Sequence, residues 1–324
     1  MRSRFAFLFS FCTLAASSTA LTLVAAACSS SKESPASLPL IEGGSGGRRD
    51  SGDPPIDEQD AEVADTYIPP GTPGRVYAHT ADTLYLFEPV TNDLKMIGKF
   101  TCLNGSEQII DLAVDRTGSV YATSFTRFLK VDPITAACTE IKANAVGDDD
   151  YPNALSFVPA GTVDPTREAL VGYASTGAGV ESIDYVRIDT KTGDMTKIGS
   201  LNPTAVGTQY KSSGDLISLI QNQNRTFLTV KIFGSDAGAN TDLLAEVDPK
   251  TGSIKKILGD TKQTDIYGLG YWAGKGYGFS DNGKISEIDM ATGSATVVKT
   301  LTGDGGAGIP WFGAGVTTEA PITR

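Results

Sequence analysis

The sequence contains little of the chemistry from which active sites are usually built. Its 324 residues include a single histidine, His79, and four cysteines. No His/Cys/Asp spacing typical of a metal site occurs, and the glycine-rich stretch at residues 303–306 lacks the lysine of a phosphate-binding loop. A lone histidine on an expected strand is more typical of a core or surface position than of a ligand. No catalytic residue is therefore assigned, and a non-catalytic role is favoured.

Positive charge is also scarce. The chain has 27 Lys and Arg against 38 Asp and Glu, a net charge of −11. Nucleic-acid binding depends on Lys and Arg clusters that neutralise phosphates, so nucleic acid is excluded as a partner. Anionic lipid would repel such a chain. Any membrane attachment must therefore come from something other than a basic patch.

The N-terminus has the pattern of an export signal. A basic start, Met1-Arg2-Ser3-Arg4, precedes an uncharged stretch that ends in small residues, which predicts a signal peptide over residues 1–27. The sequence Val24-Ala25-Ala26-Ala27-Cys28 resembles the lipobox of bacterial lipoproteins. That resemblance implies that Cys28 becomes the first mature residue and carries acyl chains such as palmitate, which would anchor the protein to a membrane.

The residue after the cysteine indicates an address. Ser29 stands there rather than aspartate. By resemblance to Gram-negative lipoproteins, this implies the outer membrane, with the protein facing the periplasm or the cell surface. Two alternatives remain open: ordinary cleavage at the same bond, giving a soluble protein, and an uncut membrane anchor. Residues 28–73 follow as a lipidated N-terminus and tether that is expected to be disordered, because its apolar residues are few and lack a period.

A short phrase recurs through the rest of the chain: two apolar positions, an acidic residue, two variable residues, Thr and usually Gly. Its acidic residues are Glu88, Asp132, Asp189, Asp248 and Asp289, in steps of 44, 57, 59 and 41 residues. Asp-Pro at the start and Gly at the end predict a tight turn, and segments of alternating polarity flank it on both sides. Steps of this size are typical of a four-stranded propeller blade.

The two ends of the repeat region complement each other. The first repeat begins with the segment Arg75-Val76-Tyr77-Ala78, which corresponds to the second strand of a blade, and Trp311-Phe312-Gly313-Ala314-Gly315-Val316 resembles a lone first strand. Joining them would close a ring and remove open strand edges. The prediction is an all-β, five-bladed β-propeller over residues 74–319 with a tail at 320–324. A six-bladed ring with a blade hidden in residues 143–183 is the alternative.

The recurring phrase also resembles the D-P-x-T-G turn of bacterial lipoproteins and periplasmic proteins with propeller domains. That resemblance implies the architecture and leaves the function open, because propellers serve in binding, scaffolding and catalysis. Among the cysteines, Cys102 and Cys138 remain once the signal and lipid positions are removed. Both are expected at the outermost strands of adjacent blades in an oxidising compartment, so we predict a disulfide, with two free thiols as the alternative.

The long connections indicate a binding surface. Most of them join the outermost strand of one blade to the next blade, or the second strand to the third, and therefore share one face. This face is expected to bind an unidentified protein or glycan. The candidate binding residues on it are Asp149, Tyr151, Tyr267 and Trp311.

Two other roles are compatible with the sequence. Propeller lactonases resemble this architecture and hold a metal in the central channel, where Asp111, Asn153, Asp215 and Asp265 are the candidate ligands here. No cofactor is predicted otherwise; a divalent cation such as Ca²⁺ is the alternative. A purely structural envelope protein is the remaining role.

Overall fold

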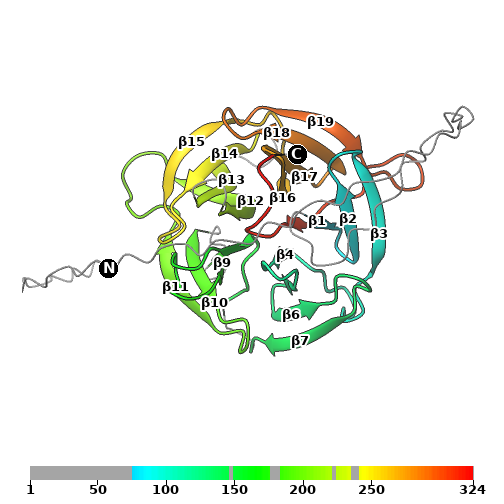
Figure 1. Ribbon diagram of the computed structural model, residues 1–324, viewed down its shortest axis with the longest axis horizontal. Helices are drawn as coiled ribbons and strands as arrows, with labels where there is room; N and C mark the ends of the chain where they lie inside the picture. The colour runs from blue at the N-terminus through cyan, green and yellow to red at the C-terminus, as the bar shows by residue number, and fades with distance from the viewer. Residues whose placement is uncertain (1–74, 146–148, 176–182, 221–223, 235–240, 324) are drawn as a thin grey trace, which may run out of the picture. The chain divides into compact units, whose positions relative to one another are not determined.

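The computed structural model describes residues 75–145, 149–175, 183–220, 224–234 and 241–323, and Figure 1 shows it along the axis of the ring. The predicted signal peptide, Cys28 and the tether lie outside the described residues. The described residues form twenty strands and no helix, arranged as five four-stranded antiparallel sheets around a ring. The predicted five-bladed propeller is confirmed, and the six-bladed alternative is wrong.

The strands of each blade follow one another from the axis of the ring to its rim. Blade 1 is β20 (Gly313–Gly315), β1 (Val76–His79), β2 (Thr83–Glu88) and β3 (Asp93–Lys99). Blade 2 is β4 (Asp111–Val114), β5 (Val120–Thr123), β6 (Arg127–Val131) and β7 (Cys138–Ala143). Blade 3 is β8 (Leu155–Val158), β9 (Ala169–Ala174), β10 (Asp184–Ile188) and β11 (Met195–Ser200).

Blades 4 and 5 complete the ring. Blade 4 is β12 (Tyr210–Leu219), β13 (Arg225–Ile232), β14 (Leu243–Val247) and β15 (Ile254–Asp260). Blade 5 is β16 (Ile266–Trp272), β17 (Lys275–Ser280), β18 (Lys284–Asp289) and β19 (Ala295–Thr300). Because adjacent strands are antiparallel, connections alternate between two faces. We call the face with the connections into each innermost strand the upper face, and the opposite one the lower face.

The ring closes where the sequence predicts. The C-terminal strand β20 pairs with β1 in an antiparallel register that places Tyr77 opposite Gly315, Ala78 opposite Ala314 and His79 opposite Gly313. Blade 1 is thus built from both ends of the propeller, as Figure 1 shows by the red strand beside the cyan ones. This pairing covers the edge of β1 that faces the axis, so that edge is not left open.

The recurring phrase forms the turn before each outermost strand. In blade 3 the Asp189 carboxylate accepts the N–H groups of Lys191 and Thr192, and the Asp189 carbonyl accepts the N–H of Gly193. Gly193 has a φ of 74°, a left-handed conformation that costs glycine least. The same bonds recur at Asp132, Asp248 and Asp289.

The blades meet at the rim through two kinds of contact. At the bulge near the end of the outermost strand, three blades have Gly98, Gly199 and Gly259, and a Cβ at these positions would meet the Thr carbonyl in the turn of the next blade. The other two blades have lysines there, Lys142 and Lys299, which pair with Asp194 and Asp93 of the next blade. Each recurring turn therefore also positions the preceding blade.

Candidate functional site

Two buried aspartates meet at the axis of the ring. Asp111 is the first residue of β4, and Asp215 lies in the middle of β12 at the equivalent position; both side chains are fully buried. Asp111 accepts the N–H of Leu112 at 2.8 Å and that of Leu155 in blade 3 at 2.6 Å. Its two oxygens therefore join blades 2 and 3.

Asp215 joins the other three blades. Its carboxylate accepts the N–H of Leu216 in its own blade at 2.6 Å, of Leu269 in blade 5 at 3.1 Å and of Ala314 in blade 1 at 3.3 Å. The innermost strand of every blade thus donates one backbone N–H to one of two carboxyls. The equivalent positions in the other blades are Ala154, Gly268 and Gly313, and a Cβ on Gly313 would collide with Asp111. Two carboxyls fill this space, and small residues accommodate them.

Burial raises the pKa of both carboxyls well above the ordinary range of aspartate, and at Asp111 the charge of Asp215 raises it further. The backbone N–H groups act in the opposite direction at both residues. Because these N–H groups occupy the carboxyl oxygens, few lone pairs remain for a metal ion. At the axis, backbone N–H groups of all five blades therefore surround the carboxyls of Asp111 and Asp215.

The four predicted channel ligands have different surroundings. Asp265 lies three residues before Gly268 and is paired with Lys231, and the buried Oδ1 of Asn153 has no hydrogen-bond partner among the described residues. In the described part of the chain, no group of three or more His, Cys, Asp or Glu residues could hold a metal ion. Asp111 and Asp215 lie near the axis, as the sequence suggests, and their carboxyls accept backbone N–H groups there.

The lower end of the axis is covered by the C-terminal residues 316–321, which we call the strap. The Thr318 carbonyl accepts the N–H of Ile220 below blade 4, and the Pro321 carbonyl accepts that of Ala273 below blade 5. The Thr318 hydroxyl donates to Glu168 of blade 3, which also accepts the N–H of Arg116 in blade 2. Ala320 is fully buried. Residues 320 and 321, placed in the tail by the sequence, therefore pack on the propeller.

His79 lies near the axis at the upper end of β1, where its Nε2 would meet a Cβ on Gly313. Its ring is fully buried, Nδ1 hydrogen-bonds the Thr80 carbonyl, and burial lowers the pKa of the imidazole to about 4. The ring is therefore neutral at pH 7 and Nδ1 carries the proton, which leaves Nε2 as an acceptor. Nε2 is buried without a hydrogen-bond partner among the described residues.

The predicted binding residues on the upper face separate into two groups. Tyr151 and Trp311 are buried, a correction to the sequence-based expectation: the Tyr151 hydroxyl donates to the Gly193 carbonyl, and Trp311 Nε1 donates to that of Gly283. Both tie blades together as core residues. Asp149 is exposed and Tyr267 is partly buried, where burial raises its phenol pKa to about 12.

A charged cluster lies between blades 4 and 5 on the upper face. Lys231 contacts Asp265 and lies 3.6 Å from the Asp242 carboxylate, which also accepts from the Ser213 hydroxyl and the Ile266 N–H. Burial raises the pKa of Asp242 to about 6. Since these groups bond mainly to one another and to the backbone, the cluster joins two blades.

The sequence does not single out the apolar residues that are exposed on this face. Phe125, Val206, Ile232 and Phe233 are exposed to 54%, 86%, 45% and 46% respectively. Three of them surround the upper end of β12 and β13, strands of 10 and 8 residues, where the Phe233 N–H donates to the Gln209 carbonyl. These two strands are longer than the others of the ring.

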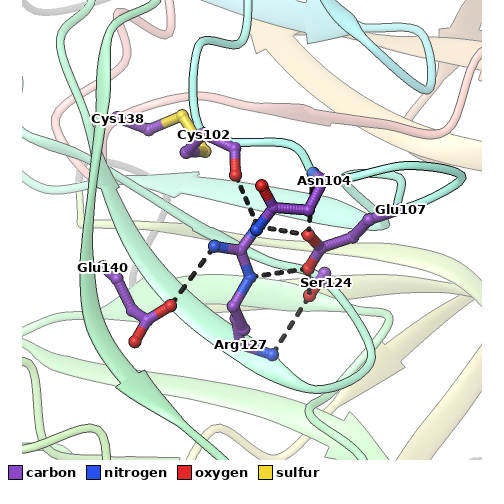
Figure 2. A network of polar contacts seen from close by, with 7 residues as sticks. All are labelled: Cys102, Asn104, Glu107, Ser124, Arg127, Cys138 and Glu140. Carbon is purple, nitrogen blue, oxygen red and sulfur yellow. Dashed lines mark hydrogen bonds and ion pairs between the residues drawn. A yellow bond between two sulfur atoms is a disulfide. The ribbon is translucent and has the colours of Figure 1, made fainter.

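Another part of the upper face is fixed by covalent and ionic contacts (Figure 2). The disulfide between Cys102 and Cys138 is confirmed; Cys102 lies in the connection after β3, not in the strand as expected. Arg127 donates to both oxygens of Glu107 and to the Cys102 carbonyl, and it also pairs with Glu140. These contacts hold the connection between blades 1 and 2 against blade 2.

The lower face carries two equivalent hollows. One of 480 Å³ is lined by residues of blade 2 that include Thr117, Lys130 and Asp132. The other, of 640 Å³, lies beside the matching turn of blade 5 and includes Arg225, Lys275 and Asp289. Both are open and lie away from the axis. Separately, the part of the chain that the structure describes has no helix long and apolar enough to cross a membrane.

The fold and these sites define the class of the molecule: a five-bladed β-propeller with an acid pair at its axis and a loop-rich upper face. The chain matches no family model and no curated protein. It is similar to a chain of the nidogen–laminin complex, with 11% identity and a TM-score of 0.45 over 77% of this chain and 99% of that one.

Two further similarities have lower scores. BamB from Moraxella catarrhalis shows 12% identity and a TM-score of 0.32, covering 71% of this chain and 60% of that one. The Dos1 propeller shows 11% identity and a TM-score of 0.35, covering 72% and 57%. These are likenesses of fold, and the blade count rests on the sheets of this chain itself.

Proposed function

We propose that this protein is a lipid-anchored module of the cell envelope that binds a protein partner through its upper face. The observation that carries the proposal is the exposure of Phe125, Val206, Ile232 and Phe233 on that face. Exposed apolar residues on a rigid scaffold are typical of protein-binding surfaces, where aromatic anchors supply much of the affinity. No reaction is proposed, because the carboxyls at the axis are buried and occupied by backbone N–H groups.

The N-terminal residues carry the proposed anchor and location. Arg75 precedes β1, whose first residue, Val76, lies on the lower side of the ring. The outer membrane remains the proposed location because Ser29 follows Cys28. Replacing Cys28 by serine should move the exported chain from the membrane fraction to the soluble fraction.

The binding proposal can be tested with matched surface variants. Ile232→Ser combined with Phe233→Ser removes two of the four exposed apolar side chains of the upper face, and Val90→Ser combined with Ile134→Ser removes two exposed ones from the lower face. Each full chain serves as bait for solubilised envelope proteins. We expect one protein to bind the native chain and the lower-face variant, and to bind the upper-face variant at least ~30-fold more weakly, as for a loss of about 2 kcal/mol.

Two outcomes would contradict the proposal. One is equal binding by both variants, and the other is loss confined to the lower-face variant. Titration of the native chain with envelope glycans separates a glycan partner from a protein partner. Saturable glycan binding that survives the upper-face substitutions would place recognition elsewhere.

A further inference from the structure

We propose that Asp111 and Asp215 share a single proton and form a proton-dependent lock, which draws the five innermost strands together while the proton is bound and loosens the ring when it is lost. This goes beyond the proposed binding function and does not depend on it. The lock consists of one N–H from each blade, converging on two carboxyls. The carboxyls lie close together, because Asp111 Oδ1 would meet a Cβ on Gly313 while Asp215 accepts the N–H of the next residue, Ala314.

Two aspartates buried this close together favour a shared proton. Two carboxylates offer only acceptors, so a hydrogen bond between them forms only when one of them is protonated. Like charges buried side by side repel strongly, and a proton shared between two carboxyls relieves that repulsion. Both side chains are fully buried, so water cannot screen a second negative charge.

The donors assign the proton to Asp111. Asp215 accepts three N–H groups and Asp111 accepts two. A carboxylate with more N–H donors is the better anion, so Asp215 keeps the charge and Asp111 donates to it. The pair then carries one negative charge, surrounded by five N–H dipoles.

The strands around the pair supply no competing charge at the axis. Besides the two aspartates, β1, β4, β8, β12, β16 and β20 carry the titratable residues Tyr77, His79, Tyr210, Lys211, Tyr267 and Tyr271. Lys211 lies opposite Lys231 at the upper end of β12, four residues before Asp215. His79 Nε2 lies near Asp111, since both would contact a Cβ on Gly313. The imidazole is neutral at pH 7, because burial lowers its pKa to about 4.

The proton links folding to pH in a defined direction. The folded pair binds a proton at pH values where the unfolded aspartates, with pKa values of about 3.9, have released theirs. Its contribution to stability is therefore complete below about pH 4 and is lost as the pH rises toward the raised folded pKa. The sign is opposite to that of a salt-bridged surface aspartate.

Infrared spectroscopy detects the proton directly. The full chain with ¹³C-labelled aspartate side chains is measured in the Asp242→Asn background, because Asp242 has a pKa of about 6 and would contribute its own band. At pH 7 we expect the carbonyl band of a protonated aspartic acid, which disappears when Asp111→Asn is added. A spectrum at pH 7 with carboxylate bands alone would overturn the proposal. This measurement does not depend on the folding of a variant at Asp111 or Asp215.

Unfolding equilibria test the link to stability. Between pH 5 and pH 7, the urea unfolding constant of the native chain should rise with pH about tenfold per pH unit more steeply than that of Asp111→Asn, the effect of one bound proton. The Asp242→Asn chain should keep this extra slope over its own Asp111→Asn derivative. Parallel pH dependence of the native chain and Asp111→Asn would contradict the lock. Failure of the binding test with the surface variants would leave both results unchanged.

Discussion

The two faces of the propeller are built differently. On the lower face, the strap runs beneath the inner strands and bonds to blades 3, 4 and 5, and the recurring turns bond within themselves and to the preceding blade. On the upper face, the connection between blades 1 and 2 is fixed by a disulfide and Arg127, while the connection between blades 3 and 4 exposes Val206.

This difference separates the parts that hold the ring together from the part that is free to bind. Below the axis, the N–H groups of Ile220 and Ala273 are paired with the strap, so a ligand there would have to displace covalently connected chain. The residues near Val206 and Phe233 expose apolar surface that a partner could bury without breaking such bonds. The upper side of blade 4 is thus the region best suited to recognition.

Removing the strap should have the largest effect on stability. A chain that ends at Val316 leaves the N–H groups of Ile220 and Ala273 and the carboxyl of Glu168 without these partners. At 1–3 kcal/mol for each group, we expect the free energy of unfolding to fall by about 3–9 kcal/mol in urea titrations. Removing only residues 322–324 is the control and should change little. Equal stability of the two truncated chains would show that the strap does not close the lower face.

Removing the disulfide comes next. Replacing both Cys102 and Cys138 by serine removes a disulfide between cysteines that are 36 residues apart in the sequence. The entropy of the unfolded chain then predicts a loss of about 3–4 kcal/mol. Amide hydrogen exchange should become faster in residues 101–108. The exchange rate of that connection should then approach the rate of the connection at residues 202–209. An unchanged unfolding midpoint would mean that the Arg127 contacts alone fix it.

The smallest effect is expected at the connection between blades 3 and 4. The Asn202 side chain donates to the Tyr210 carbonyl and accepts the Tyr210 N–H. Asn202→Ala should cost only about 1 kcal/mol by urea titration, because water can replace these partners in a partly exposed loop. A loss as large as that from removing the disulfide would show that both connections are equally fixed. The proposed difference between the connection of blades 1 and 2 and that of blades 3 and 4 would then be wrong.

Local pattern is enough to predict the architecture. Turn chemistry at Asp132 and Asp248 and the match between segments near Val76 and Ala314 are readable in one dimension, and the structure confirms both. The disulfide follows from assigning its two cysteines to adjacent blades. These features depend on residue type and spacing, which the sequence contains.

The axis and the binding face depend on what the sequence does not contain. Residue type predicts Asp111 and Asp215 in the channel, but the backbone N–H groups that occupy them are the same for every residue type. The signal that points to the pair is the series Asp111, Ala154, Asp215, Gly268 and Gly313, in which two acids alternate with small residues. Tyr151 and Trp311 are buried although they adjoin loops, because adjacency to a loop does not reveal burial.

Photo-crosslinking in cells that export the full chain tests the central claim, that recognition uses the upper face. A photoreactive phenylalanine analogue replaces Val206 or Phe233 on the upper face, and Val90 or Ile134 on the lower face, all exposed in the free protein. We expect an adduct of the same mass from both upper positions and none from the lower ones. Adducts from the lower positions alone, or none from any position, would contradict it.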